Sequence, residues 1–436
     1  MSVVFALATP PAKSAICIFR VSGAGCHSVL GQIFSRDVFC PNKFSVATMS
    51  YGGKVIDRVG LVVFNGPKSY TGEDSFELYA HGSLAIMSNI VDVFKGLGFE
   101  EAPGGEFTKR AFLNNKITLV EAEAVSDLID STDSRGVVLS NKTLFGELSS
   151  KVVLFGEEID AVRVKVEGEI DFSDEDNDYF DSSLITTLDS LIERFGLFIG
   201  ACVSKKIGDE KNNVVLAGPV NSGKSSVFNR LLGFERAIVS NTPGTTRDMI
   251  GSELFYKSNS FSIYDTAGIR KTSDVIEKRG IDISISEIKN ADLVLGIFEN
   301  NNPDEIDYFK KMCGDKNFIC IQNKSDLNKK DVNFDCSVSA KTGEGFAELK
   351  LLIEKSFKSD TKNNEYDFLI KERHGKLFDL VLDDLKKAKA NLSEHNNLEL
   401  VAEDLKNARS SLDQVIGKKF SDSLLGDIFS SFCIGK

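Results

Sequence analysis

The sequence predicts a multidomain protein of mixed α/β and α+β type, in which a doubly wound, mostly parallel sheet is inserted into an all-helical domain. Three observations predict this fold class. Residues 212 to about 357 alternate short apolar runs with helical patterns, as a doubly wound sheet requires. Amphipathic helical patterns precede this stretch and return after it. The first part of the chain instead mixes strand-like runs, turn residues and one helical pattern, which indicates an α+β domain.

These patterns divide the chain into four segments. We expect the N-terminal α+β domain over residues 1–117, the first part of the helical domain over 118–210, the α/β domain over 211–357 and the second helical part over 358–436. The polar run Gly208–Asn213 is the expected linker into the α/β domain. A chain of 436 residues is long enough for about three domains, each with its own core.

Strands in the N-terminal domain are expected where apolar residues alternate with polar ones or run together, at residues 16–21, 59–64 and 76–79. Another patterned strand is expected close to the N-terminus. A helix is expected over residues 83–96, because its apolar residues recur at helical spacing, with Ser83 as its N-cap.

The later segments carry longer patterns. Four apolar runs predict the buried strands of the α/β domain: residues 214–217, 261–264, 293–298 and 318–322. One apolar helix face in the first helical part is marked by Val125, Leu128 and Ile129. After the α/β domain no strand pattern returns, and long amphipathic helices are expected over residues 369–392 and 398–416.

Composition and charge exclude several classes of protein. The net charge of −12 argues against a surface that binds nucleic acid over its whole extent, but is compatible with a local basic patch. The eight cysteines form no C-x-x-C pair and histidines number four, so we expect reduced thiols and no zinc site. No apolar run approaches about 18 residues and no basic region opens the chain. We therefore expect a cytoplasmic protein without a membrane partner.

An acidic run, Asp171–Asp178, interrupts the first helical part. It has two interpretations. Its carboxylates could bind a metal, but their spacing matches no EF-hand loop, so a solvated loop is favoured.

The phosphate loop is the most specific motif in the chain. Residues 218–225 fit G-x-x-x-x-G-K-[ST] between an apolar run and a helical pattern, where a chance glycine-rich turn is the less favoured interpretation. Its glycines let the backbone approach a phosphate, Lys224 should reach the β- and γ-phosphates, and the Ser225 hydroxyl should bind Mg²⁺. The residues expected to contact the nucleotide phosphates are Asn221, Ser222, Gly223, Lys224, Ser225 and Ser226.

Two further motifs follow in the order of a nucleotide switch. Thr246, in T-P-G-T-T-R-D, is the expected second Mg²⁺ ligand, and Asp265, in D-T-A-G, should hold Mg²⁺ through water. The Gly268 amide should lie near the γ-phosphate. The full expected set is Ser240, Asn241, Thr242, Pro243, Gly244, Thr245 and Thr246, with Asp265, Thr266, Ala267 and Gly268.

A fourth motif, N-K-S-D, selects the base. Asp326 can accept hydrogen bonds from guanine N1–H and from its 2-amino group, which adenine lacks, so GTP and GDP are preferred over adenine nucleotides. The residues expected around the base are Asn323, Lys324 and Asp326, together with Ser339, Ala340 and Lys341. Four motifs in this order predict a GTP-hydrolysing site.

One position departs from the usual switch. Where many such enzymes have a glutamine after D-x-x-G to orient the attacking water, this chain has Ile269. The segment that follows offers Asp274, Glu277 and Asp282. Spacing alone does not choose between them, and all three could be surface carboxylates.

Further motifs resemble those of the MnmE (TrmE) family of tRNA-modification GTPases, over essentially the whole chain. They are Ala8-Thr-Pro-Pro, Ser69-Tyr-Thr-Gly-Glu-Asp, Glu106-Phe with Arg110-Ala-Phe-Leu-Asn, and the terminal Phe432-Cys-Ile-Gly-Lys. The resemblance implies an N-terminal domain for folate binding and dimerisation, followed by a helical domain that contains an inserted G domain. One departure is Pro103, which lies one residue earlier than the family pattern has it.

The resemblance also implies site residues. It implies a K⁺ ion, which replaces an arginine finger, and a water-orienting glutamate at Glu277. The implied K⁺ ligands are Asn221, Ser240, Thr242 and Thr245. The implied contacts to 5-formyl- or 5,10-methylene-tetrahydrofolate are Arg20, Glu77, Lys116 and Lys436. Cys433 is the implied cysteine of the modification step.

The implied partners are a second copy of the chain, tRNA and the FAD-binding protein MnmG (GidA), in a heterotetramer that modifies C5 of the wobble uridine at position 34. Two rivals remain. A ribosome-assembly GTPase of the Era or EngA type would carry a KH-type module with G-x-x-G in a basic surround, which the sequence lacks. A nucleotide-gated scaffold would not need the intact Lys224, Ser225, Thr246 and Asp265.

Overall fold

The structure is a computed structural model of the whole chain. It describes residues 2–35, 39–131, 134–171, 183–204, 212–233, 251–256, 259–265, 288–314, 316–328, 331–357, 366–394 and 397–436. The described chain forms two compact units. The first consists of residues 1–130, 139–202 and 368–436, and the second of residues 131–138 and 203–367.

The N-terminal part of the first unit is a six-stranded sheet in the order β3-β4-β5-β2-β1-β6. Its strands are β1 (Val4–Leu7), β2 (Ile16–Ser22), β3 (Ser45–Tyr51), β4 (Lys54–Phe64), β5 (Ser75–His81) and β6 (Glu100–Glu101). All neighbours pair antiparallel except β1 and β6. The strands expected at 16–21, 59–64 and 76–79 are therefore confirmed, whereas β3 was not anticipated.

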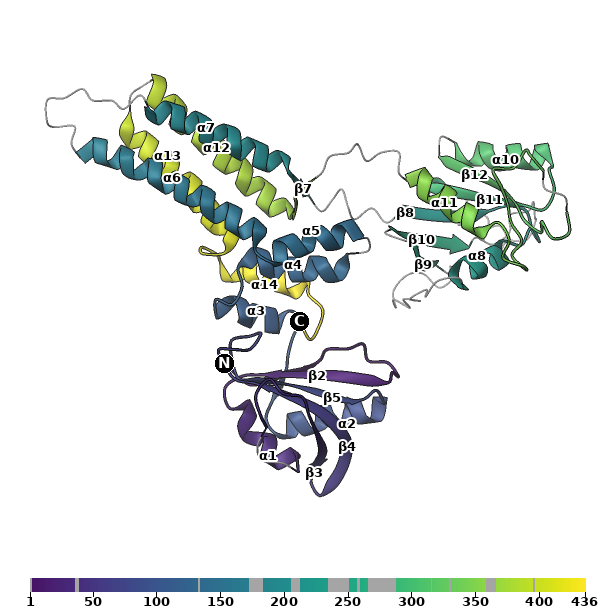
Figure 1. The fold of residues 1–436 in the computed structure, drawn as a ribbon, viewed down its shortest axis with the longest axis horizontal. Helices are drawn as coiled ribbons and strands as arrows, with labels where there is room; N and C mark the ends of the chain where they lie inside the picture. The colour runs from purple at the N-terminus through teal and green to yellow at the C-terminus, as the bar shows by residue number, and fades with distance from the viewer. Residues whose placement is uncertain are drawn as a thin grey trace. The chain divides into compact units, whose positions relative to one another are not determined.

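One helix covers a face of this sheet, because its apolar stripe packs on the strands (Figure 1). α2 (Leu84–Gly96) has Ser83 at its N-cap position, as expected, although the Ser83 side chain makes no capping hydrogen bond. Phe94 of α2 is fully buried and contacts the rings of Phe5, Phe19 and Phe76. Two short helices, η1 (Cys26–Val29) and α1 (Leu30–Ile33), follow β2.

The helical part of the first unit has one core built from two distant stretches of chain. Its long helices are α6 (Glu147–Asp171), α7 (Ser183–Gly200), α12 (Glu372–Glu394) and α13 (Leu398–Ile416). Buried residues of α6 and α7, such as Phe195, pack in the same cluster as Phe378 and Leu412 of α12 and α13. Neither stretch could bury its apolar face alone. The expected insertion of the α/β domain into a helical domain is thereby confirmed.

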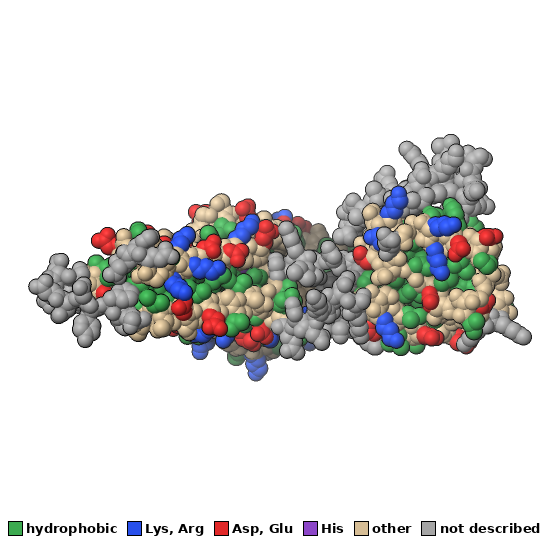
Figure 2. All heavy atoms as spheres, turned by 90° about the horizontal axis from the view of Figure 1, so that it is seen from above, with side chains coloured by type: hydrophobic (Ala, Val, Ile, Leu, Met, Phe, Trp, Pro, Cys, Tyr) green, Lys and Arg blue, Asp and Glu red, His purple; other side chains and the backbone are tan. Residues whose placement is uncertain are grey.

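Shorter helices connect the helical core to the N-terminal sheet. They are α3 (Glu106–Leu113), α4 (Leu119–Asp130), α5 (Ser134–Leu144) and α14 (Asp422–Ser430). On the face shown in Figure 2, acidic and basic side chains lie interspersed over the long helices. Ion pairs such as Arg194–Glu158 and Lys389–Asp189 join the long helices. No helix among the described residues is long and apolar enough to cross a membrane.

Two expectations about the chain around the insertion were wrong. A strand does return after the α/β domain, because β14 (Phe368–Ile370) buries Phe368 and Ile370 on one side and the Phe368 N–H donates to the Ala201 carbonyl at 3.4 Å. Its three apolar residues had merged with the helical pattern that follows, and α12 starts only at Glu372. The expected linker also ends early, since β8 already begins at Asn212. A short strand, β7 (Cys202–Ser204), precedes it.

The second unit contains a doubly wound sheet in the order β13-β12-β11-β8-β10-β9. Its strands are β8 (Asn212–Ala217), β9 (Gly251–Tyr256), β10 (Asn259–Asp265), β11 (Leu293–Phe298), β12 (Asn317–Gln322) and β13 (Cys336–Ser337). Only β9 runs antiparallel to its neighbour. The four expected strands are confirmed, and β9 and β13 are additional.

Helices cover both faces of this sheet, as the predicted fold class requires (Figure 1). α8 (Lys224–Gly233) and α11 (Phe346–Phe357) bury their apolar residues on one face. α10 (Pro303–Cys313) buries Ile306 and Phe309 on the other. Every residue of β11 is buried, because the strand is covered from both sides.

Candidate functional site

The phosphate loop begins where β8 ends and closes where α8 starts. Gly218 and Gly223 have positive φ angles of 147° and 88°. A Cβ atom at 218 would lie 2.2 Å from the Ile297 carbonyl oxygen, and one at 223 would lie 2.2 Å from Asn323 Nδ2. Only glycine fits these positions. The loop is therefore held close against the ends of the neighbouring strands.

The side chains of this loop are suited to receive an anion. Lys224 is buried, and its Nζ donates to the carbonyl oxygens of Gly218 and Pro219 at 3.0 and 2.8 Å. Ser222 is buried, and its Oγ has no hydrogen-bond partner within the described part of the chain. Ser225 is exposed in the first turn of α8. A buried ammonium group and an unpartnered hydroxyl beside a helix N-terminus are groups that a phosphate can pair.

Asn323 joins the phosphate loop to the segment that follows β12. Its Nδ2 donates to the Ser222 carbonyl at 2.9 Å, and its Oδ1 accepts from the Ala340 N–H at 3.3 Å. Asn323 is buried, so these hydrogen bonds are shielded from water. The expected phosphate motif and the two expected base motifs thus meet at one side chain.

Asp326 lies beside this junction and is exposed. Ser339 Oγ donates to Asp326 Oδ1 at 2.7 Å, and this hydrogen bond lowers the pKa of the Asp326 carboxyl group below its usual value. The group is therefore ionised at neutral pH and can accept hydrogen bonds from two donors of a base. Lys324 has a positive φ of 60°, and its Nζ pairs with Glu299 at 2.6 Å.

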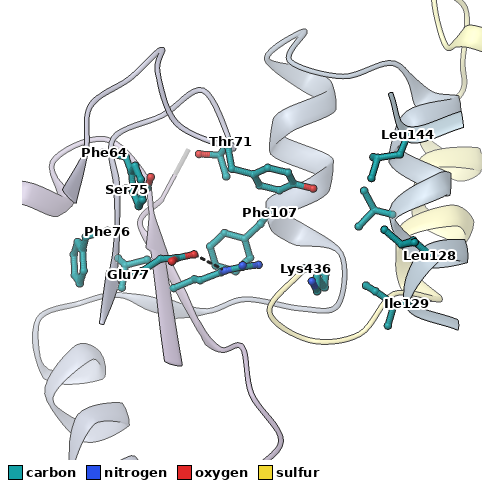
Figure 3. A pocket seen from close by; sticks show the side chains of 14 residues that line it. Phe64, Thr71, Ser75, Phe76, Glu77, Phe107, Leu128, Ile129, Leu144 and Lys436 are labelled. Atoms are coloured by element: carbon teal, nitrogen blue, oxygen red, sulfur yellow. Dashed lines mark hydrogen bonds and ion pairs between the residues drawn. The ribbon is translucent and has the colours of Figure 1, made fainter. Parts of the chain in front are cut away.

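A separate cavity of about 380 Å³ lies in the first unit, between the N-terminal sheet and helices α3, α4 and α5 (Figure 3). Its polar end is built on adjacent strands. Arg20 of β2 lies directly opposite Glu77 of β5, and Arg20 Nε donates to Glu77 Oε1 at 2.9 Å. Tyr79 Oη donates to the other carboxylate oxygen at 2.7 Å. Burial, reinforced by Glu77, raises the pKa of Tyr79 to about 12, so the phenol keeps its proton.

The C-terminus of the chain completes this polar end. Arg20 Nη1 donates to the Gly435 carbonyl at 3.0 Å, and the Phe107 N–H donates to the Lys436 carbonyl at 3.1 Å. Gly435 has φ of 90°, and a Cβ there would lie 2.8 Å from Ala8 Cα, so the tail packs tightly on the N-terminal part. Burial and the neighbouring Arg20 charge lower the pKa of Lys436.

The opposite wall of the cavity is apolar. Val125, Leu128 and Ile129 of α4 line it together with Leu144 of α5. Figure 3 shows Leu128, Ile129 and Leu144 across the cavity from Glu77 and Phe76. A site with a carboxylate and two cationic groups at one end and an apolar wall at the other suits a flat heterocycle that carries both hydrogen-bond donors and acidic groups.

Two family models match consecutive parts of the chain. The model described as GTP-binding protein TrmE N-terminus matches residues 3–116, and the model described as MnmE helical domain matches residues 119–433. The chain belongs to the MnmE family of tRNA modification GTPases. The family expected from the motifs is thus confirmed, together with its class of enzyme, the GTP hydrolases.

Curated members of the MnmE family match along their whole length. The tRNA modification GTPase MnmE of Thermosipho melanesiensis is 34% identical over 446 residues, with 99% of both chains covered. That of Legionella pneumophila (strain Corby) is 35% identical over 443 residues, again covering 99% of each. Among solved structures, the G domain of the T. maritima FeoB iron transporter is 28% identical over 34% of this chain and 99% of its own, with a TM-score of 0.28.

Many of the expected MnmE switch residues lie outside the described residues. They are Ser240, Asn241, Thr242, Pro243, Gly244, Thr245 and Thr246, with Thr266, Ala267, Gly268, Asp274, Glu277 and Asp282. Asp265 is described only as the last residue of β10, paired with Leu216 of β8. Among the described residues no group of three or more His, Cys, Asp or Glu side chains is placed to hold a metal ion. The expected Mg²⁺ and K⁺ ligands stay predictions.

The expected folate contacts are only partly brought together. Arg20, Glu77 and Lys436 line the cavity, whereas Lys116 does not, and its Nζ donates to the Pro67 carbonyl at 2.9 Å. Cys433 is exposed in the terminal tail. At the early proline, a Cβ at Gly104 would lie 2.4 Å from the Phe432 carbonyl oxygen, so the segment after Pro103 accommodates that tail.

Sequence reasoning missed several residues of the cavity wall. Tyr70 and Thr71 belong to the motif Ser69–Asp74, which the sequence links to the family but not to a site. Leu128 and Ile129 are predicted by the sequence as part of an apolar helix face, with no indication of what that face contacts. The motif and the helix face were the available signals, but nothing local in the sequence shows that they share one cavity with Phe107.

Proposed function

We propose that this chain is a potassium-activated GTPase that, with an FAD-dependent partner, adds an aminomethyl or carboxymethylaminomethyl group to C5 of the wobble uridine, position 34, of certain tRNAs. Its relatives are named tRNA modification GTPases, which supports the tRNA as substrate. The observation that carries the proposal is the cavity, because a GTPase site alone would not require a second, charged and partly apolar site in the same chain.

GTP is proposed to bind at the phosphate loop and the Asn323 junction. Lys224 and the unpartnered Ser222 hydroxyl suit the phosphates, and the ionised Asp326 suits the guanine edge. Ser225, with the predicted Thr246 and Asp265, would hold Mg²⁺, which neutralises charge on the phosphates when bound. Hydrolysis would drive or time a conformational cycle and would not enter the carbon chemistry.

A 5-formyl- or 5,10-methylene-tetrahydrofolate is proposed as ligand of the cavity. Glu77 can accept from the amino-pyrimidine edge of a pterin, while Arg20 and Lys436 can meet the folate carboxylates. The apolar wall suits the ring systems. When bound, the folate would supply the one-carbon unit. Lys116 and Cys433 are further proposed participants.

The proposed partners are a second copy of the chain, the FAD-binding MnmG (GidA) protein and tRNA, in the cytoplasm. Deleting the gene tests the proposal directly. Mass spectrometry of tRNA from the deletion strain is expected to show unmodified C5 at the wobble uridine, restored by a plasmid copy. Unchanged wobble uridines would contradict the proposed function.

Asn221 should decide which monovalent ion supports hydrolysis. It has φ of 66°, a left-handed conformation that asparagine tolerates, inside the phosphate loop. If Asn221 binds K⁺ near the γ-phosphate, Asn221→Ala should lower GTP turnover in K⁺ by about 100-fold, because one electrostatic stabiliser is lost. The measurement compares GTP turnover of the unaltered chain and of the variant in K⁺ and in Na⁺. In Na⁺, little turnover is expected for either protein.

Asn300→Ala, at an exposed position after β11, is the matched control and should leave the K⁺ response unchanged. Glu277→Ala should lose turnover without losing K⁺ binding, because its proposed role is to orient water. Equal turnover in Na⁺ and K⁺ for the unaltered chain would contradict the proposed K⁺ activation.

A further inference from the structure

Arg110 of α3 is a buried charge that the proposed chemistry leaves without a role. Its side chain is only 3% exposed. It pairs with two carboxylates, Glu73 at 2.9 Å and Glu106 at 2.8 Å. A buried ion pair is costly to desolvate and does not by itself indicate a gain in stability. The position of this guanidinium group therefore suggests another purpose.

The guanidinium group connects three segments of the N-terminal part to α3. Arg110 Nη1 donates to Glu73 Oε2 at 2.9 Å, to the Ser22 carbonyl at 3.3 Å and to the Ser2 carbonyl at 3.0 Å. Ser22 ends β2, Ser2 precedes β1, and Glu73 belongs to the segment between β4 and β5. Arg110 Nε is used for Glu106, one turn earlier on its own helix. A planar group with several donors is suited to such a junction, whereas an ammonium group is not.

Further hydrogen bonds hold the segment of residues 65–74 against α3. Tyr70 Oη and Thr108 Oγ1 lie 3.0 Å apart, and Asn114 Nδ2 donates to the Thr71 carbonyl at 2.7 Å. Thr108 and Arg110 thus contact the segment from α3, and Asn114 contacts it from the position that follows the helix. Of the contacts from these three residues, that of Arg110 is the one that pairs a cation with a carboxylate.

Buried hydrogen bonds also connect the end of β2 to the segment of residues 65–74. Ser22 Oγ lies 2.7 Å from Thr71 Oγ1 and donates to Glu73 Oε2 at 2.9 Å. Ser22 and Thr71 are both buried. One carboxylate oxygen of Glu73 therefore accepts hydrogen bonds from both the Arg110 guanidinium group and the Ser22 hydroxyl. Loss of either donor leaves this partly desolvated carboxylate with one hydrogen bond fewer.

These contacts lie directly behind the cavity wall. Tyr70 and Thr71 line the cavity, and so do Arg20 and Val21, which immediately precede Ser22 in β2. The two segments that carry the polar wall are therefore both attached to Arg110. A small displacement of either would change the distance between Thr71 and Arg20, and misplacement by about 1 Å is enough to impair a binding site.

We propose that Arg110 is a positioning residue of the cavity, which acts through Glu73 and Ser22 to hold the wall segments at the spacing that the folate needs. The inference rests on the proposed function of the cavity and extends it to a residue that does not contact the ligand. Arg110 belongs to the first unit, whereas the phosphate loop belongs to the second.

Two carboxylates on one guanidinium group offer a matched test. Glu73 and Glu106 lie at nearly equal distances from Arg110 and have similar side-chain exposures of 16% and 18%. Glu73→Gln weakens the link to the cavity wall, whereas Glu106→Gln removes the same charge from α3 itself. Arg110→Lys keeps the charge but loses the fork of donors. The affinity of each full-length variant for 5-formyl-tetrahydrofolate is measured by calorimetry.

Arg110→Lys and Glu73→Gln are expected to weaken folate binding at least tenfold, and Glu106→Gln no more than about twofold. GTP turnover should stay unchanged in all three. Hydrogen exchange gives a readout independent of the ligand: amides of residues 65–74 should exchange faster in Arg110→Lys and Glu73→Gln than in Glu106→Gln.

The outcomes separate the two proposals. If the unaltered chain does not bind the folate, the proposed function of the cavity fails, while hydrogen exchange still reports on positioning. If the unaltered chain binds and Glu73→Gln resembles Glu106→Gln in both affinity and exchange, Arg110 is not a positioning residue. General destabilisation would make both carboxylate variants equally weak, and that result also overturns the inference.

Discussion

Replacing Lys224 with alanine is expected to lower kcat/KM for GTP by about 10³-fold, which corresponds to roughly 4 kcal/mol of lost transition-state stabilisation. Lys224 is buried, and its Nζ donates hydrogen bonds to the carbonyl oxygens of Gly218 and Pro219. Both of these acceptors are neutral. A phosphate at the same loop offers negative charge instead, so the interaction strengthens as charge develops on the γ-phosphate.

Steady-state GTP hydrolysis in K⁺ and Mg²⁺ measures this effect, and binding of a fluorescent GDP analogue separates affinity from turnover. Lys311→Ala, which removes an exposed lysine of α10, is the matched control and should hydrolyse GTP like the unaltered chain. Lys224 also holds the loop together, so the variant's circular dichroism is compared with that of the control. Hydrolysis within tenfold of the unaltered chain would show that this lysine has no part in phosphoryl transfer.

The long periodic elements were predictable from the sequence. The helix expected over residues 398–416 is α13 with the same limits, and the strand expected over 293–298 is β11. The helix is buried along one face and the strand on both faces, without interruption in either. The hydrophobic pattern of each sequence segment therefore directly reflects its packing. The same reasoning failed for β14, because three residues are too few to distinguish a strand from the first turn of a helix.

The two candidate sites differ in how far the sequence revealed them. The phosphate and base motifs are contiguous, since a loop after a strand supplies most of each, and so their residues could be named from spacing. The hydrogen bond from Asn323 to the Ser222 carbonyl could not be predicted from spacing, because the two residues lie about 100 positions apart in the chain. The cavity is harder still. Its wall comes from separate strands, three helices and the last residue of the chain, and only tertiary packing brings Lys436 to Arg20.

A second buried ionic cluster in the first unit leads to the other large expected effect. Glu123 of α4 accepts from Arg373 Nε and Nη2 at 2.8 and 2.7 Å, and His374 Nε2 lies 2.9 Å from its Oε2. Asp127, one turn further along α4, pairs with Lys371. These basic residues lie at the start of α12, where the chain resumes the helical core. We expect Glu123→Gln to destabilise this core by about 3–5 kcal/mol, because it leaves a guanidinium group without its carboxylate.

The pH dependence should follow the same cluster. Burial raises the pKa of Glu123, but the neighbouring His374 ring and Arg373 guanidinium group lower it more, to about 2 from 4.5. The stability that this carboxylate contributes, roughly 3 kcal/mol, is therefore present above pH 4.5 and lost as the pH falls toward 2. Burial lowers the pKa of His374 below 6.5, so its neutral form is favoured in the fold and its contribution is lost as the pH falls below 6.5. Both groups weaken the fold in acid.

Urea unfolding from pH 7 to pH 3, followed by hydrogen exchange of α4 and α12, measures both effects. Glu123→Gln should unfold earlier at pH 7 and should lose stability less steeply below pH 4.5, since the titrating group is gone. Glu372→Gln is the matched control, because Glu372 is exposed on the same helix start and pairs with the exposed Lys376, so at most about 0.5 kcal/mol is expected. A variant whose acid sensitivity equals that of the unaltered chain would contradict the assignment to Glu123.

The double variant Glu123→Leu with Arg373→Met decides whether the cost comes from the unpaired charge. If it does, the double variant should be more stable than Glu123→Leu alone by about 2 kcal/mol or more, because no partly buried guanidinium group is left without its carboxylate. Cavity formation predicts the reverse, since two altered side chains would disturb the packing more than one. The contacts of Arg373 favour the first result. Within the described part of the chain, its Nη1 and Nη2 otherwise reach the Gln414 and Val415 carbonyls, both at 3.4 Å, which are weak substitutes for a bidentate carboxylate.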